Sequence, residues 1–312
     1  MRIVSLLPSA TEIVYLLGLG DHLTGVSHEC DYPRAALGKR KIIAPAFESS
    51  GLSSQEIDGS VRAFLGRGEG IYRIDLEALR AADPDLIVTQ ELCDVCAAPY
   101  QDVLEAVTHL SRKPEVLSLN PQRLGDVLQD VERVGEATGR LREAAQAVAS
   151  LTERIDRVEK RAANAKTRPP VACLEWLDPI MASGHWVPEM VALAGGREPL
   201  GKVGEPSERV QWERVLSAEP EILILMPCGF SVDRTLDEIH LLTNRPGWEG
   251  LPAVRRGKVF AVNGHAYFSR SGPRLVDGTE ILAHLVHSEL FPGPIPAEAA
   301  KTVHRWPTTD NR

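Results

Sequence analysis

The sequence predicts an α/β protein of two lobes with mainly parallel sheets, joined by one long helix. Short apolar strands alternate with amphipathic helices at both ends of the chain, a pattern typical of parallel sheets. Between them, residues 123–164 contain no proline and carry apolar side chains at steps of three and four, the spacing of one helical face. We therefore expect an N-terminal lobe over 1–121, a linking helix over 122–166, a C-terminal lobe over 167–290 and a proline-rich tail over 291–312.

The composition limits the classes of partner. The 312 residues are 43% apolar and 25% charged, which is ordinary for a globular chain with room for two domains. A formal net charge of −8 argues against nucleic acid or an anionic membrane as the main partner. No stretch of the sequence approaches the roughly 20 apolar residues of a membrane-spanning helix. We expect neither a nucleic acid partner nor a membrane span.

The first strand and helix occupy the apolar N-terminal stretch. Residues 3–7 form a predicted buried strand that Pro8 ends, and Ser9 with Glu12 three residues later matches a helix-capping box. Polar residues break this stretch, and no cleavage site of small residues follows it, so it does not read as a secretory signal. The sequence therefore predicts a cytoplasmic protein, or a mature form whose export signal has been removed.

The rest of the N-terminal lobe continues the alternation. A strand over 23–27 leads into a loop, and a helix with apolar residues at helical spacing follows over 53–65. The further predicted elements are a short helix over 75–79, a strand over 86–89, a helix over 99–110 and a strand over 115–119.

The linking helix is the longest predicted element. About 40 residues would make a rod of roughly 60 Å, which is longer than one domain needs. Gly135, Thr138 and Gly139 interrupt the apolar stripe, which argues against a coiled coil. A spine between two lobes explains the length better than the alternative, an ordinary core helix that happens to be long.

The C-terminal lobe begins after Pro169 and Pro170. A helix opened by Pro188 ends at a glycine pair, and a loop over 263–274 precedes the last helix, which runs to about residue 290. The remaining predicted elements are strands over 171–174, 222–226 and 258–262 and helices over 211–218 and 234–242.

An internal repeat relates the two lobes. Residues 76–87 match residues 212–223 at a constant offset of 136, as from Pro84 to Pro220. Each copy contains a short helix, an acidic-Pro-acidic turn and a buried strand. Because ligands of α/β sheets bind beyond the carboxyl ends of the strands, we expect the binding site in a cleft between the lobes.

Several short motifs occur in an order that resembles one protein family. They are SLLPSATE at 5–12, DYP at 31–33, PDLI at 84–87, SG at 183–184 and SGPR at 271–274. Together with the long helix, this set resembles the substrate-binding proteins of ABC importers for cobalamin and ferric siderophores, over residues 1 to about 290. The cobalamin-binding branch is the closer match.

The resemblance implies a non-catalytic protein that holds cobalamin, or a related corrinoid or metal complex, in the cleft between two lobes. The ligand would be carried to an ABC permease or, because no export signal is evident, within the cell. In the family, one surface glutamate on each lobe docks on the permease, and the matching positions are Glu77 and Glu213. Both could equally be ordinary solvated helix residues. The chain departs from the family in an additional helical segment near 49–70.

Aromatic and basic side chains mark candidate ligand contacts. Aromatic residues are only 5% of the chain, yet several lie in loops after predicted strands, where flat rings suit a corrin or another large planar ligand. Packing between loops is the alternative role. The candidate ligand-binding residues are Trp176, His185, Trp186, Tyr267, Phe268 and Arg270.

A second set of residues could hold a metal. Cys93 and Cys96 are three residues apart, a spacing that can chelate one metal or form a redox-active disulfide. The candidate metal ligands are His28, Cys30, Glu91, Cys93, Cys96 and Cys228. They support an alternative function, a cytoplasmic metalloprotein or redox protein with a zinc or iron-sulfur centre. Small apolar cysteines packed at strand ends are the simpler explanation.

Overall fold

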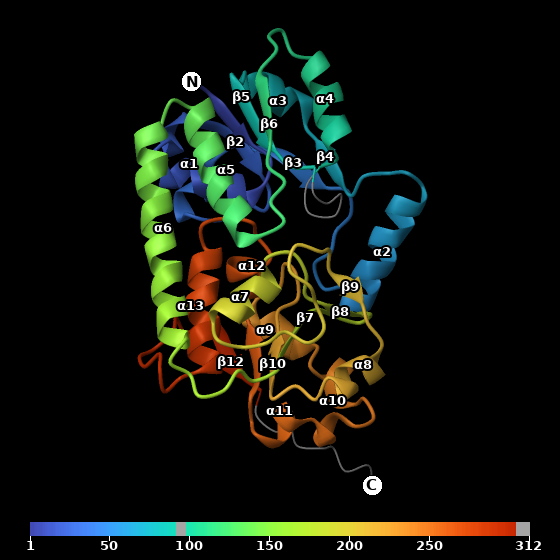
Figure 1. Cartoon of the computed structure of the whole chain (residues 1–312). Helices are drawn as coiled ribbons and strands as arrows, with labels where there is room; N and C mark the ends of the chain where they lie inside the picture. The colour runs from blue at the N-terminus through green and yellow to red at the C-terminus, as the bar shows by residue number, and fades with distance from the viewer. Residues whose placement is uncertain (92–97, 304–312) are drawn as a thin grey trace. The chain divides into compact units, whose positions relative to one another are not determined.

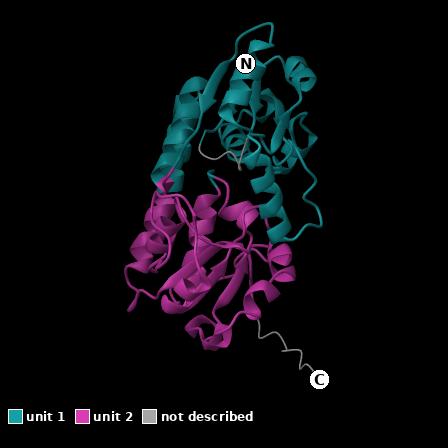
Figure 2. Ribbon diagram, turned by 90° about the vertical axis from the view of Figure 1, so that its right-hand side faces the viewer, with its two compact units in different colours: residues 1–121, 125–152, 271–273 teal, residues 122–124, 153–270, 274–312 magenta. Residues whose placement is uncertain are grey.

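The chain forms two compact α/β units. A computed structural model describes residues 1–91 and 98–303. Unit 1 comprises residues 1–121, 125–152 and 271–273, and unit 2 comprises 122–124, 153–270 and the chain from 274 onward (Figure 2). The predicted α/β class with two lobes is confirmed. Within the described residues, no helix combines the length and the apolar character that a membrane crossing requires.

Unit 1 is built on a six-stranded, mainly parallel sheet in the order β4-β3-β2-β1-β5-β6. Only β4 runs antiparallel to its neighbour. The strands are β1 (Ile3–Ser5), β2 (Leu23–Ser27), β3 (Lys41–Pro45), β4 (Tyr72–Ile74), β5 (Leu86–Thr89) and β6 (Glu115–Ser118). The central strand β1 is buried at every position, as expected of a parallel strand covered on both faces.

Helices cover both faces of this sheet. Ile3 packs with α1 (Pro8–Leu16) and α5 (Leu124–Ala137), whereas its neighbour Val4 packs with α3 (Leu76–Ala82) and α4 (Tyr100–Thr108). Successive side chains of a strand point to opposite faces, so one strand supports both hydrophobic layers. Unit 1 also contains α2 (Ser54–Gly66) and two short 3₁₀ helices, Gly20–His22 and Arg34–Gly38.

The predicted capping box at Ser9 is wrong. Helix α1 begins one residue earlier, at Pro8, and its N-cap is Leu7, which makes no side-chain capping bond. Proline has no N–H to satisfy and a fixed φ suited to the first helical position, so it starts the helix itself. The capping box of this unit lies instead at Ser53 and Glu56, where each side chain bonds the backbone of the other residue at the start of α2.

The stretch predicted as one long helix forms two. Helix α5 ends at Ala137 and α6 (Leu141–Ala162) begins after a turn in which Gly139 has a φ of +68°. A Cβ atom on Gly135 would lie 2.4 Å from the Cβ atom of Ala144, so glycine lets the two helices meet side by side (Figure 1). Helix α6, with 22 residues, carries the chain from unit 1 into unit 2 after Thr152.

Unit 2 is built on a mixed six-stranded sheet in the order β12-β11-β10-β7-β8-β9. Its three central strands, β11, β10 and β7, are parallel, and the strands at both edges are antiparallel to their neighbours. The strands are β7 (Val171–Leu177), β8 (Ile180–Ala182), β9 (Glu208–Arg209), β10 (Ile222–Leu225), β11 (Val259–Val262) and β12 (Ala300–Thr302). The predicted proline-rich tail therefore supplies an edge strand, beside the fully buried Ala299.

The helices of unit 2 are short except for the last. They are α7 (Val187–Leu193), α8 (Trp212–Ser217), α9 (Val232–Asp237), α10 (His240–Thr243), the 3₁₀ helix Trp248–Gly250, α11 (Pro252–Arg255), α12 (Gly264–Tyr267) and α13 (Leu275–Val286). A Cβ atom on Gly278 of α13 would lie 3.0 Å from the Met190 side chain of α7, so these two helices are in direct contact. Trp212 and Trp248 stack in the core on the α8 side.

The internal repeat is confirmed in detail. Helices α3 and α8 are followed by Asp83 and Glu219, which share a left-handed backbone with φ of +43° and +44°. Leu86 N–H then donates to the carbonyl of Arg2, and Ile222 N–H donates to the carbonyl of Pro170. The same turn thus delivers β5 and β10 to the central strands β1 and β7.

Candidate functional site

The carboxyl ends of the three parallel strands of unit 2 form one connected cluster. The ring of Trp176, in β7, lies 5.2 Å from the ring of Phe230, which follows β10. His265, which follows β11, donates its backbone N–H to the carbonyl of Phe230 at 3.1 Å. The backbone of Cys228 also donates to the carbonyl of Glu175 at 3.1 Å. Loops from all three strands therefore meet at one place, at the end of the sheet where ligands of α/β folds commonly bind.

The loop after β11 contains three of the predicted contacts. Phe268 is only 2% exposed, and its carbonyl accepts the indole N–H of Trp186, itself 7% exposed, at 2.8 Å. Both rings are therefore packed within unit 2, where they support the loops. Tyr267 is half-buried, with its hydroxyl 3.4 Å from Glu298, and burial raises the pKa of that hydroxyl. Arg270 is buried, and its guanidinium donates to Nε2 of His265 at 2.5 Å.

Two carboxylates fasten the segment 183–207 to β7. Glu175 accepts the backbone N–H of Gly184 at 3.3 Å and the hydroxyl of Ser207 at 2.5 Å. Glu198 accepts the backbone N–H groups of Cys173 and Leu200. It also accepts the backbone N–H of Gly201 in a short bond. Burial raises the pKa of each carboxyl to about 7. No local pattern in the sequence points to Glu198.

His185 lies at the start of this segment, next to α7. Its backbone has a φ of +50°, which is unusual for a residue with a side chain. Its N–H donates to Glu205 at 2.6 Å and its carbonyl accepts from Gly204 at 2.9 Å. Its ring lies 5.5 Å from the ring of Trp186, and burial lowers the pKa of the imidazole. The ring is therefore neutral near pH 7.

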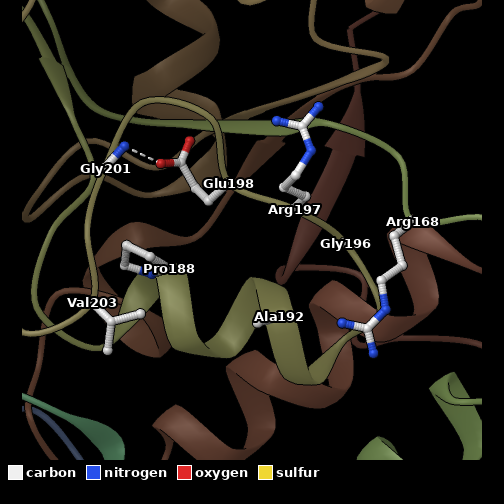
Figure 3. A pocket seen from close by; sticks show the side chains of 8 residues that line it. All are labelled: Arg168, Pro188, Ala192, Gly196, Arg197, Glu198, Gly201 and Val203. Atoms are coloured by element: carbon white, nitrogen blue, oxygen red, sulfur yellow. Dashed lines mark hydrogen bonds between the residues drawn. The ribbon is translucent and has the colours of Figure 1, made fainter.

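A pocket of about 330 Å³ lies on another part of unit 2, beside α7 (Figure 3). Helix α7 forms one side of it through Pro188 and Ala192, and the carboxylate of Glu198 turns toward Gly201 rather than into open space. Arg197 pairs by backbone with Pro170, at the amino end of β7. The pocket is thus not part of the cluster at the carboxyl ends of the strands.

The predicted metal ligands of unit 1 are engaged elsewhere. Cys30 is fully buried in the core and accepts the hydroxyl of Thr11 at 3.0 Å. The ring of His28 lies 5.7 Å from that of Tyr72, with Nε2 3.3 Å from a carboxylate oxygen of Glu29.

The described residues do not form the predicted metal centre. Glu91 uses its backbone N–H to bond Asn120. Cys228 is exposed and belongs to unit 2, whereas Cys30 belongs to unit 1. Over residues 1–91 and 98–303, no three His, Cys, Asp or Glu side chains are grouped to hold a metal ion. Cys93 and Cys96 lie outside the described residues.

One exposed aromatic residue in unit 1 was not among the predicted contacts. Tyr32 follows the carboxyl end of β2 and is 49% exposed. Its position in the DYP motif, directly after a predicted strand, was the available signal. The predicted docking residues Glu77 and Glu213 are both exposed and stand at the second position of α3 and α8.

Comparison with known proteins places this geometry in a family. The family model described as periplasmic binding protein matches residues 3–265. The chain belongs to the periplasmic binding protein family. The resemblance read from the sequence is therefore confirmed, and it covers both units.

Individual relatives and solved structures agree over nearly the whole chain. The vitamin B12-binding protein of Vibrio cholerae is 26% identical over 300 residues, with 89% of this chain and 86% of that protein covered. The uncharacterised ABC transporter substrate-binding lipoprotein YvrC of Bacillus subtilis is 24% identical over 304 residues, with 93% and 81% covered. The structure of a periplasmic heme-binding protein of Pseudomonas aeruginosa matches with a TM-score of 0.72 at 18% identity, covering 97% and 98% of the two chains. That last similarity concerns the fold.

Proposed function

We propose that this protein is the substrate-binding component of an ABC importer and that its ligand is cobalamin or a related corrinoid. The observation that carries the proposal is the cluster at the carboxyl ends of β7, β10 and β11, where loops with Trp176 and Tyr267 meet. Flat aromatic side chains suit the face or the rim of a macrocycle. The similarity of this protein to a vitamin B12-binding protein, over 89% of the chain, supports a corrinoid as the ligand.

The protein acts by binding and delivery rather than by catalysis, and it works outside the cytoplasm. Support for this location comes from the relatives, which include a lipoprotein, and from the similar structure of a periplasmic vitamin B12-binding protein of Vibrio cholerae. The cytoplasmic location expected from the sequence is therefore not retained. The zinc or iron-sulfur alternative loses support as well, because the described candidates for its ligands lie in different units or in the core.

The permease partner is recognised through Glu77 and Glu213. They occupy the same position of the repeat in the two units, and both carboxylates are exposed. Each lies in the first turn of a short helix whose other face packs into its own unit, through Leu79 in α3 and Val215 in α8. A matched pair of exposed carboxylates on equivalent helices suits a partner with two basic pockets.

Variants that divide binding from delivery test this function. Trp176→Ala is expected to weaken cobalamin binding at least about tenfold, because it removes a large aromatic contact. Trp248→Phe, in the core on the α8 side, is the control and should leave affinity within about twofold. The double variant Glu77→Lys, Glu213→Lys should bind cobalamin normally yet fail to support uptake.

Calorimetric titration with cobalamin and an uptake assay with the matching transporter would measure these effects. Haem and a ferric siderophore serve as competing ligands in the same titrations. If Trp176→Ala binds cobalamin with unchanged affinity, the Trp176 ring does not contact the ligand. If only haem binds tightly, the ligand is a porphyrin and not a corrinoid.

A further inference from the structure

We infer that His185 binds the metal at the centre of the macrocyclic ligand, as an axial ligand supplied by unit 2. This inference rests on the proposed function, because it requires a ligand with a central metal. It adds a direct bond between the protein and the cobalt or iron of the ligand.

The backbone of His185 is held in a conformation that favours glycine. Three described residues other than glycine have a positive φ, and two of them, Asp83 and Glu219, belong to the equivalent turns of the repeat. The third, His185 at +50°, has no such structural counterpart. A side chain kept at a strained position, where glycine would fit better, points to a use for that side chain.

The surrounding segment over-determines this conformation. Both backbone groups of His185 are bonded, to Glu205 and to Gly204. A Cβ atom on the preceding Gly184 would lie 2.4 Å from the backbone nitrogen of Ser207, so the two stretches of chain are in tight contact. Glu175 bonds both stretches, through Gly184 and Ser207. His185 is thus a fixed point on a clamped loop.

The imidazole is oriented and keeps its lone pair available. Its ring lies against Trp186 at an interplanar angle of 35°, and the indole of Trp186 is anchored by its bond to Phe268. The adjacent loop is the one that follows the carboxyl end of β11.

The other described histidines differ from His185 in their contacts. Nitrogens of His22, His284 and His287 bond backbone carbonyls, and His265 accepts from Arg270. His28 contacts Glu29, and the remaining two, His109 and His240, are on the surface. Half-buried His185 forms no hydrogen bond through its ring nitrogens with any residue in 1–91 or 98–303. An imidazole with unbonded nitrogens and an immobilised ring can serve as a metal ligand.

The ligands of similar proteins share the matching chemistry. Vitamin B12 is a cobalt corrin and haem is an iron porphyrin, and both are named for proteins similar to this chain. Each presents a metal with an axial position that an imidazole nitrogen can occupy. In the binding step the lone pair of His185 displaces a water molecule from the metal; no electron is transferred and no proton moves.

The decisive experiment compares two cobalamins, one whose axial group on the metal can be replaced and one whose axial group cannot. Aquocobalamin carries a replaceable water, whereas cyanocobalamin carries a cyanide that stays bound. The variant His185→Asn keeps a residue that tolerates positive φ but lacks the imidazole. The affinity of this variant for aquocobalamin should be about tenfold lower than that of the unmodified protein. Its affinity for cyanocobalamin should be within about twofold of that of the unmodified protein. His240→Asn, an exposed histidine on α10, is the matched control.

Spectroscopy and chemical rescue give an independent readout. Mixing aquocobalamin, or ferric haem in a parallel arm, with the unmodified protein should shift the visible bands to those of an imidazole complex. His185→Gly should lose this shift while remaining at least as stable, and added imidazole should restore it. If the visible bands do not change on binding, or if His185→Asn gives the same shift as the unmodified protein, His185 does not bind the metal. Either result would leave the proposed function standing. Absence of binding by every macrocycle would overturn both.

Discussion

The two units share one structural repeat and differ in what lies beside its central strand. In unit 1 the neighbour of β1 opposite β5 is β2, a parallel strand. In unit 2 the neighbour of β7 opposite β10 is β8, which turns back antiparallel and leads into the segment 183–207. The shared half builds the scaffold. The half that differs carries His185 and Glu198 in a loop that Glu175 of β7 also clamps, and the sheet of unit 1 has no topological equivalent of this loop.

The largest expected difference between the units is their response to pH. Burial raises the pKa of Glu175 and Glu198 to about 7, above the value of 4.5 for a solvated glutamate. A raised pKa means that the folded state binds the proton more tightly. The stability that protonation contributes is therefore fully present below about pH 4.5 and is lost as pH rises through 7, by at most about 3 kcal/mol for each group.

Urea unfolding between pH 5 and 8 would measure this effect. The variant Glu175→Gln, Glu198→Gln should lose most of the decline, because it carries no proton to release. In unit 1, burial raises the pKa of Asp130 to about 6, so Asp130→Asn should flatten a separate decline centred one pH unit lower. If the glutamine pair shows the same decline as the unmodified protein, the two carboxylates do not hold the loop as described.

The next difference between the units is a close backbone contact in unit 2, between Gly201 and Ser183. A Cβ atom on Gly201 would lie 1.9 Å from the carbonyl oxygen of Ser183, a contact that requires the backbone to move. Gly201→Ala should lower the free energy of unfolding by about 2–3 kcal/mol. In α5, Gly125 has nothing within 4 Å of the same position, and Gly125→Ala should stabilise the protein by about 0.5–1 kcal/mol. Equal losses in the two variants would contradict the close crossing.

The equivalent turns of the repeat should give the smallest effect. Glu219→Gly relieves a side chain at positive φ and should stabilise the protein by about 0.5–1 kcal/mol. Asp83→Gly relieves the same strain but also removes ion pairs with Arg2 and Arg112, so its gain should be smaller or absent. Thermal unfolding of both variants measures the difference. A larger gain from Asp83→Gly would show that those ion pairs do not contribute.

Local signals explain how much of the fold could be predicted. The acidic-Pro-acidic turns revealed the repeat because the turn residues and the adjacent strand lie together in the sequence. The sequence showed an interruption of the apolar stripe at Gly139, but the break between two helices was not predicted, because apolar side chains resume at helical spacing directly after it. The start of α1 was misplaced because Pro8 and Ser9 are both residues that begin helices, and the sequence alone does not decide between them.

The candidate site was predictable only in outline. The loops after β7, β10 and β11 followed from the strand pattern, and they do meet in unit 2. Which aromatic rings are buried there depends on distant partners, as when Phe268 accepts the indole of Trp186. Glu198 has no local signature, since one of its bonds reaches Cys173 on β7, 25 residues earlier. Long-range hydrogen bonds of this kind are visible only in the folded chain.

The central claim is that one corrinoid binds to each chain. Calorimetric titration of the full chain with cobalamin measures this directly, with haem and a ferric siderophore titrated in parallel. We predict saturation at one cobalamin per chain, with an affinity in the micromolar range or tighter, and weaker binding of the other two ligands. Absence of cobalamin binding under conditions where haem or the siderophore saturates would contradict it.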